Sequence, residues 1–136
     1  MPNVFVDTNI FLCCFDNSDP SKRDTARNRV AGLEDALVTS TQVLQEFYWN
    51  ATKKLRMTPI EAKRAVEHIS LQKVIQIGPS MIVHAIDTSD AHRISFWDAL
   101  IIEAAAMARC STLLSEDLNH GQVIRGIKVE NPFANG

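Results

Sequence analysis

The sequence predicts an α/β fold, in which helices cover both faces of a central parallel sheet of four to five strands in a three-layer α/β/α arrangement. Short β-prone apolar runs alternate along the 136 residues with longer segments of helical periodicity, a pattern typical of parallel sheets. Residues that start helices lie between these runs, and neither an internal repeat nor a low-complexity linker divides the chain. We therefore expect one domain over residues 1–136.

The N-terminal half contains two predicted strands and two predicted helices. Residues 3–6 are a short apolar run and predict the first strand. Asp19 followed by Pro20 has the pattern of an N-cap with proline at the first helical position, and predicts a charged helix to about residue 33. Residues 36–40 predict the second strand. The helix expected over residues 41–55 has one apolar face, formed by Val43, Leu44, Phe47, Tyr48, Ala51 and Leu55.

The C-terminal half continues the alternation. Thr58 and Glu61 have the spacing of a capping box and predict a helix to about residue 70. Residues 73–77 predict the third strand, which the pair Gly78-Pro79 ends. The remaining elements are expected at 80–92 and 95–107 as helices, and at 112–115 and 127–129 as strands.

The composition is that of an ordinary soluble globular protein, with 46% hydrophobic and 22% charged residues. No apolar run reaches the roughly 18–20 residues that a membrane span needs. The first residues, MPNVFVDTN, lack the basic and apolar regions of a signal peptide, so we expect a cytoplasmic protein. Cys13, Cys14 and Cys110 form no CxxC pair, and we expect them to be reduced thiols.

The net charge of −2 is not that of a typical nucleic-acid binder. However, if four of the 16 acids form a metal site, 12 acids face 14 bases and the rest of the chain carries +2. The bases gather in two clusters: Lys22, Arg23, Arg27 and Arg29, and then Lys53, Lys54, Arg56, Lys63 and Arg64. Either cluster is equally consistent with a solvated helix face.

Asp98 and Glu103 interrupt the otherwise apolar helix expected at 95–107, and a buried carboxylate is costly unless it is paired, hydrogen-bonded or bound to a metal. In an open α/β sheet, ligands bind beyond the carboxyl ends of the strands. Asp7 and Asp117 follow two predicted strands, and Asp98 lies in the first turn of its helix. Glu46 lies in the second turn of its helix, on the side away from the apolar face. We therefore expect the four acids to meet at one edge.

Each acid also has an ordinary structural interpretation. Asp98 has the spacing to complete a capping box with Ser95, and Glu46 fits a solvated helix position. Asp7 fits a turn or an N-cap, and Asp117 an exposed turn. Only their expected convergence favours a common site.

Four neighbouring carboxylates repel one another unless a cation lies between them. Oxygen-only ligands favour Mg²⁺ or Mn²⁺. The four histidines, His68, His84, His92 and His120, have no HxH or HExxH spacing, and the cysteines do not cluster, so zinc is not expected. His120 follows Asp117 closely and fits either a place near the site or a solvated loop.

Four ordered motifs carry a resemblance to a known family. V-x-V-D-T-N at 4–9, Q-E-F at 45–47, S-x-W-D-A-L at 95–100 and L-L-S-E-D at 113–117 resemble the PIN-domain ribonucleases, and most of all the VapC-type toxins of bacterial toxin–antitoxin pairs. The resemblance covers essentially the whole chain and implies a single PIN-like domain.

The resemblance implies catalytic and metal-binding roles for the acidic quartet Asp7, Glu46, Asp98 and Asp117. Asn9 matches the polar residue that steadies the first acid, and Ser115 the small hydroxyl residue two before the last one. In an extended segment Ser115 and Asp117 share a face and Glu116 points away, although a turn would exchange Glu116 and Asp117.

The implied activity is hydrolysis of single-stranded or loop RNA by a water activated by one or two Mg²⁺ or Mn²⁺ ions, with the basic clusters on the phosphate backbone. The resemblance also implies a small DNA-binding antitoxin partner. The resemblance further implies a homodimer, and the apolar segment at 11–15, which exceeds what one helix face needs, agrees with this expectation.

Other functions remain open at this point. An aspartyl phosphotransferase or phosphatase domain also has an acidic Mg²⁺ site, but needs a second carboxylate at position 9, which is Asn9. A response-regulator receiver needs a lysine near Ser115, where Glu116 follows. A non-catalytic interaction module that holds a structural ion is also consistent with the acids.

Overall fold

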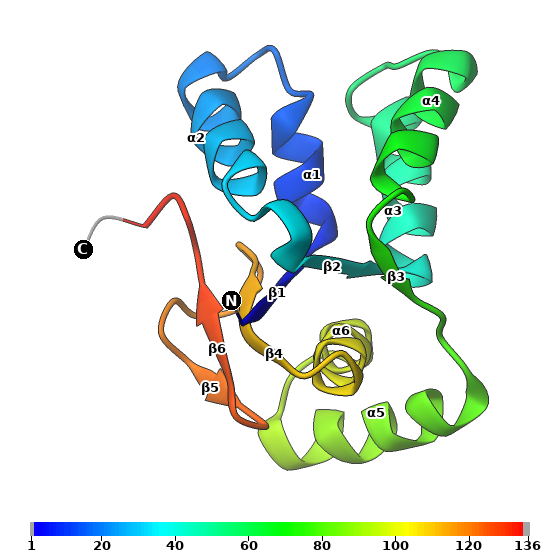
Figure 1. The fold of residues 1–136 in the computed structure, drawn as a ribbon. Helices are drawn as coiled ribbons and strands as arrows, with labels where there is room; N and C mark the ends of the chain where they lie inside the picture. Colours follow the sequence, from blue (N-terminus) through cyan, green and yellow to red (C-terminus); the bar gives the residue numbers. More distant parts are fainter. Residues whose placement is uncertain (1, 135–136) are drawn as a thin grey trace.

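A sheet with the strand order β3-β2-β1-β4-β6-β5 forms the centre of the fold in the computed structural model, which describes residues 2–134 (Figure 1). The strands are β1 Asn3–Val6, β2 Leu37–Ser40, β3 Lys73–Ile75, β4 Cys110–Leu114, β5 Val123–Ile124 and β6 Ile127–Glu130. The five strands from β3 to β6 pair in parallel, which confirms the predicted parallel sheet. The sixth, β5, pairs antiparallel with β6 at the edge and was not expected.

The hairpin that joins β5 and β6 has a two-residue turn. Arg125 and Gly126, between the paired residues Ile124 and Ile127, have φ angles of 51° and 76°. Two consecutive positive φ angles are typical of the type I′ turn, whose twist matches that of the paired strands. Because β5 is only two residues long, it has too little alternation to be predicted from sequence.

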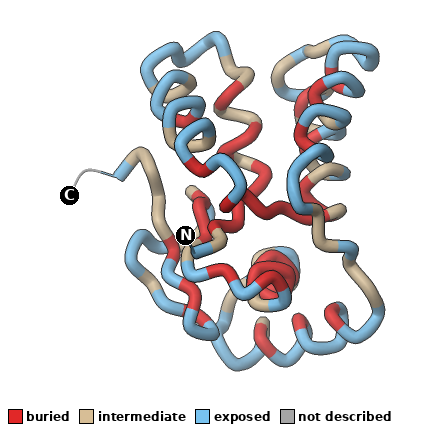
Figure 2. The backbone as a smooth tube through the Cα atoms, in the orientation of Figure 1, coloured by how far each residue is buried: buried red, intermediate tan, exposed pale blue. Residues whose placement is uncertain are grey.

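Helices cover both faces of the sheet, as predicted. They are α1 Thr8–Cys14, α2 Pro20–Ala31, α3 Thr41–Lys53, α4 Pro59–Ile69, α5 Pro79–His92 and α6 Phe96–Met107, with a 3₁₀ turn at Glu34–Ala36. Figure 1 shows α1 to α4 on one face, and α5 and α6 on the other. Figure 2 shows that the buried residues gather along the strands and on the helix sides that face them. The fold is thus three layers, α/β/α.

Two of the predicted helix starts are confirmed by their side-chain caps. Asp19 accepts a hydrogen bond from the backbone N–H of Lys22 (3.1 Å), and Thr58 and Glu61 form the reciprocal capping box. The helix α1 was not predicted. Its seven residues are too few to show a helical period, and its apolar side chains include the buried Ile10 and Phe11.

Glu103, one of the two acids in the apolar helix α6, has a structural explanation. Its side chain is 4% exposed, accepts a hydrogen bond from Thr88 Oγ1 (2.8 Å) in α5, and forms an ion pair with Arg125. These contacts connect α6 to α5 and to the β5–β6 turn. The buried carboxylate is therefore paired, as its burial requires.

Two predictions from composition can be compared with residues 2–134. Cys13, Cys14 and Cys110, all within this range, are free thiols. None of the helices described there combines the length and the apolar character of a membrane span.

Candidate metal centre

Asp7 lies at the carboxyl end of β1 and is the N-cap of α1. Its side chain is 4% exposed. The oxygen Oδ1 accepts a hydrogen bond from the backbone N–H of Thr8 (2.7 Å), and Oδ2 accepts one from Ser115 Oγ (2.8 Å). The sequence offered an N-cap and a site residue as alternatives for Asp7, and the structure shows that the N-cap position and a place at the acidic edge are compatible.

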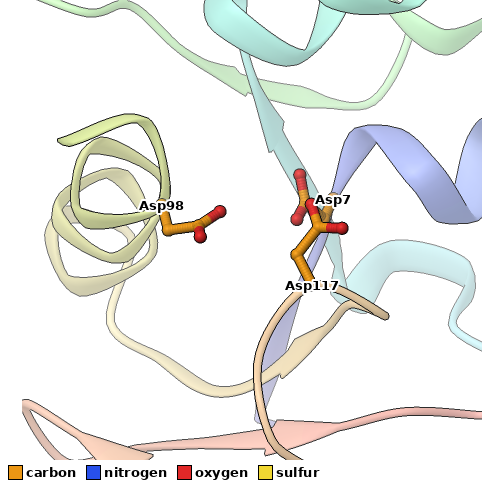
Figure 3. A group of neighbouring side chains, drawn as sticks. All are labelled: Asp7, Asp98 and Asp117. Carbon is orange, nitrogen blue, oxygen red and sulfur yellow. The ribbon is translucent and has the colours of Figure 1, made fainter. Parts of the chain in front are cut away.

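Asp98 similarly combines a helix start with a place in the site. The cap of α6 is Ser95, whose Oγ accepts a hydrogen bond from the backbone N–H of Asp98 (3.0 Å). The carboxylate of Asp98 points across the cleft toward Asp7 and Asp117 (Figure 3). One oxygen from each of these three aspartates lies within 4.8 Å of the others. Three segments far apart in sequence thus bring carboxylates to one point, as predicted.

Glu46 lies beside this group in the same cleft. Its Oε1 accepts a hydrogen bond from Thr8 Oγ1 (2.7 Å), and its Oε2 accepts one from Gln42 Nε2 (3.3 Å). Among the described residues, the group within 4.8 Å consists of the three aspartates and does not include Glu46. Glu46 and the aspartates all line a cleft of about 250 Å³. The predicted quartet therefore meets as three converging acids with a fourth next to them.

Asn9 and Ser115 support the first acid as a chain of contacts. Asn9 Nδ2 donates to Ser115 Oγ (3.4 Å), whose own hydroxyl donates to Asp7. Asn9 Oδ1 also accepts from the backbone N–H of Glu116 (3.2 Å), and Asp117 N–H donates to Ser115 Oγ (3.1 Å). Asn9 therefore acts on Asp7 through Ser115 rather than directly.

Glu116 and His120, for which the sequence allowed a place at the site, lie elsewhere. The carboxylate of Glu116 is 2.5 Å from Lys22 Nζ in α2 and 3.6 Å from Cys13 Sγ in α1. His120 Nδ1 accepts a hydrogen bond from the backbone N–H of Asn131 (3.0 Å), and His120 lines a different hollow, beside β6. Asp117 is thus the acid of the S-E-D segment that points into the cleft.

Burial and repulsion by neighbouring charges oppose ionisation of Asp7 and Asp98. Burial, followed by the charges of Asp117 and Glu46, raises the pKa of Asp7 from 3.8 to about 7, although the hydrogen bonds from Ser115 and Thr8 oppose this. Burial is also the main reason that the pKa of Asp98 is raised, with a further contribution from the same two charges. A cation at this point would offset both effects. The donors are carboxylate oxygens, which fit Mg²⁺ or Mn²⁺.

The two predicted basic clusters differ in their surroundings. In the first, Lys22 pairs with Glu116 and Arg29 pairs with Glu130 (2.9 Å), so these charges serve contacts within the fold. In the second, Lys54 is exposed and lines the acidic cleft. The second cluster is therefore the one whose lysine is available to a ligand in the cleft.

Sequence reasoning did not single out Thr8, Gln42 or Trp97, which also line the cleft. Gln42 has a weak sequence signal, because a residue four before Glu46 shares its helix face. Thr8 has none, since its contact with Glu46 depends on how α1 packs on α3.

A sequence model of the PIN domain matches residues 4–125 of the chain. The chain belongs to the PIN-domain family. Members of this family are generally nucleases that use divalent metal ions. The match runs from Val4 in β1 to the residue after β5 and includes Asp7, Glu46, Asp98 and Asp117.

Solved structures with the same fold include toxin–antitoxin proteins. A toxin–antitoxin complex from Klebsiella pneumoniae matches this PIN domain with a TM-score of 0.75 and 20% identity, covering 96% of this chain and 98% of that one. DNA-bound VapBC from Salmonella typhimurium matches with a TM-score of 0.71 and 22% identity, covering 97% of this chain and 99% of that one. VapC20 of Mycobacterium tuberculosis, a toxin that cleaves the sarcin–ricin loop, matches with a TM-score of 0.69 and 20% identity, covering 82% of this chain and 87% of that one. No curated protein matches the chain in sequence. At these identities the likeness shows the fold, which is that of VapC-type toxins.

Proposed function

We propose that this PIN domain is a metal-dependent endoribonuclease that hydrolyses single-stranded or loop RNA in the cytoplasm. The observation that carries the proposal is the convergence of Asp7, Asp98 and Asp117 within 4.8 Å, at the carboxyl edge of the sheet. Family membership favours nuclease chemistry over the other uses of an acidic site.

In this proposal Asp7, Asp98 and Asp117 hold one or two Mg²⁺ or Mn²⁺ ions. A bound ion supplies a water of lowered pKa and neutralises charge on the phosphate. The chain's own residues orient the reaction: Thr8 and Gln42 fix the two oxygens of Glu46, so that one carboxylate is held in the cleft without belonging to the three-aspartate group. Glu46, or the exposed Asp117, accepts the proton of the attacking water. Water attacks the phosphorus and the 3′-oxygen leaves with a proton, so the products carry a 5′-phosphate and a 3′-hydroxyl and no 2′,3′-cyclic phosphate forms.

The test is cleavage of an unstructured RNA with Mg²⁺ or Mn²⁺ and with EDTA. Glu46→Gln should lower the rate more than tenfold, which corresponds to a barrier increase above about 1.4 kcal/mol. Its circular-dichroism spectrum should be unchanged, because Glu46 is not in the core. Glu67→Gln, the same change at an exposed position of α4, is the matched control. Retention of more than a tenth of the activity by Glu46→Gln would remove it from the catalytic set.

Two alternatives are outcomes of the same experiment. A non-catalytic interaction module would bind the ion, with a rise in melting temperature, and cleave nothing. A phosphotransfer or phosphatase domain would release phosphate from a small phosphorylated donor and leave RNA intact.

We also propose a small DNA-binding antitoxin as partner. The similar solved structures include a toxin–antitoxin complex and VapBC bound to DNA, which supports this proposal. The test is to co-express the chain with the product of the neighbouring reading frame. A specific partner should co-purify with the chain and inhibit its RNA cleavage.

We propose a homodimer, but on a different surface from the one that suggested it. In the apolar segment 11–15, Phe11 and Cys14 are buried, at 4% and 8% exposure, and serve the core. Exposed apolar side chains instead lie along α5, at Ile82, Val83 and Ile86. Light scattering at tens of micromolar should report a dimer, and Ile86→Lys should shift it toward the monomer. A wild-type monomer would contradict the proposal.

A further inference from the structure

Trp97 is a large apolar side chain that the fold leaves exposed. It is 61% exposed, although it lies in the first turn of α6 directly before Asp98. It lines the same cleft as the four acids. An exposed tryptophan on the wall of an acidic cleft is not explained by packing or by the metal site.

The backbone beneath this ring is fixed to the acidic site. The carbonyl of Trp97 accepts a hydrogen bond from Gln42 Nε2 (3.2 Å), and the same amide donates to Glu46. Gln42 is 5% exposed, and its hydrogen bond from α3 to α6 is partly buried. The position of Trp97 is therefore linked to that of a carboxylate in the site.

The indole has a free face. Its neighbour Phe96 packs on it at a centroid distance of 5.0 Å and an interplanar angle of 76°. A T-shaped contact of this kind covers at most one face of the indole. With 61% of the residue exposed, much of the indole is accessible to a ligand.

The cleft also contains a cationic side chain. Of the described residues that line it, Lys54 is the one that is basic, and it is exposed. The cleft thus has acids for a metal ion, a lysine for a phosphate and an aromatic ring. Proteins that bind single-stranded nucleic acid combine basic groups with aromatic rings on which bases stack.

We infer that Trp97 stacks on an unpaired nucleobase next to the scissile phosphate, while Lys54 contacts a neighbouring backbone phosphate. This inference rests on the proposed ribonuclease function and adds to it a determinant of substrate class. Stacking needs a base that has left its helix, so Trp97 selects unpaired RNA over duplex. Every base has a π-face, so the contact tolerates different sequences.

The first experiment compares variants on an unstructured RNA whose cleavage position has been mapped. Trp97→Ala should lower kcat/KM by about 5- to 150-fold, the range expected for one lost stacking contact. Trp97→Phe, which keeps a ring, should retain most of the activity. Trp49→Ala is the matched control: Trp49 is 62% exposed, lies in α3 under Lys53 Nζ (4.8 Å from the ring centroid), and does not line the cleft. Unchanged kcat/KM in Trp97→Ala would overturn the inference.

The second experiment removes the base instead of the ring. Single abasic nucleotides are placed in turn at the positions flanking the cleavage point. At one position, the abasic nucleotide should lower kcat/KM of the wild type about as much as Trp97→Ala lowers it on the intact RNA. The same abasic nucleotide should not lower kcat/KM of Trp97→Ala any further. Two results would overturn the inference. If Trp97→Ala lowers kcat/KM by the same factor on every abasic substrate, Trp97 acts in folding. If the loss of kcat/KM follows dissociation of a dimer in light scattering, Trp97 belongs to a protein interface.

A binding measurement separates this inference from the proposed function. In Trp49→Phe, Trp97 is the remaining indole, and its fluorescence should be quenched by oligouridine in EDTA, where no metal-dependent cleavage occurs. Quenching by oligouridine without cleavage in Mg²⁺ or Mn²⁺ would support the stacking and refute the ribonuclease. Cleavage without quenching would support the ribonuclease and refute the stacking.

Discussion

Asp7→Asn tests whether the acidic group is held together against its own repulsion. In the absence of metal, burial and neighbouring charges raise the pKa of Asp7 from 3.8 to about 7. The folded protein therefore keeps a proton on Asp7 at pH values where the unfolded chain has lost it. A group of this kind makes stability fall as pH rises between about 4 and 7, and the loss is complete above pH 7.

The expected size of the effect follows from the shift. A shift of about three pKa units corresponds to at most about 4 kcal/mol of lost stability at pH 8. Asparagine removes the charge and keeps an oxygen for the N–H of Thr8, but it loses the bond from Ser115, at about 1 kcal/mol. Asp7→Asn should therefore be more stable than the metal-free wild type at pH 8, by up to about 3 kcal/mol. At pH 4 the gain should disappear or reverse by about 1 kcal/mol.

The assay is urea denaturation of both proteins in EDTA at pH 4 and pH 8, repeated at pH 8 with millimolar Mg²⁺. Metal should stabilise the wild type by about 2.7 kcal/mol at a hundredfold excess over its dissociation constant, and should stabilise Asp7→Asn far less. If Asp7→Asn is no more stable than the wild type at pH 8 in EDTA, the pKa argument is wrong. If it keeps the full metal increment, Asp7 is not a ligand.

Three further predictions concern stability. Asp98→Asn should melt at or above the wild-type temperature in EDTA, because burial and the neighbouring acids raise the pKa of Asp98 and so oppose its charge. The variant should also lose most of the increase in melting temperature that Mg²⁺ gives the wild type. A lower melting temperature in EDTA, together with the full increase in Mg²⁺, would make Asp98 a helix-cap residue only. Arg125→Ala should lower the free energy of unfolding, measured by urea denaturation, by about 2–3 kcal/mol, because the buried Glu103 loses its ion pair. A loss below about 0.5 kcal/mol would show that the hydrogen bond from Thr88 is enough to stabilise the buried carboxylate. Arg93→Gly should raise the stability by about 0.5–1 kcal/mol in thermal melts, because Arg93 ends α5 with a φ of 55°; a lower melting temperature would show that its side chain compensates.

The fold was predictable where local chemistry starts or ends an element. Asp19 before Pro20, and Thr58 with Glu61, specify helix starts that the side chains then make. The helix α1 and the strand β5 were not predictable, because seven and two residues are too few to show a period. Both owe their structure to neighbours: α1 packs among other helices, and β5 pairs with β6.

The site was predictable as far as topology determines it. Parallel strands end at one edge, so the acids that follow β1 and β4 had to meet there. The contact of Glu46 with Thr8 was not predictable, because it depends on how α1 packs against α3. That arrangement is set by tertiary packing such as the edge contact of Phe15 on Phe47, with centroids 5.5 Å apart, which leaves no pattern in the sequence. Similarly, Lys22 looked like a phosphate-binding residue because its partner Glu116 is far away in the chain.

Ser115 explains why the motifs around two of the acids belong together. A hydroxyl has one hydrogen to donate and two lone pairs to accept with. Ser115 Oγ donates to Asp7 and accepts from Asn9 Nδ2 and from the N–H of Asp117, so its whole capacity is used. Ser115, which directly follows β4, thereby fixes three groups at once: the carboxylate of Asp7, the side chain of Asn9 at the start of α1, and the backbone of Asp117. This network satisfies the polar groups that the buried carboxylate brings with it. Among the described residues, the salt bridges do not include Asp7, Asp98 or Asp117, and the proposed Mg²⁺ or Mn²⁺ ion would balance the charge of these three aspartates.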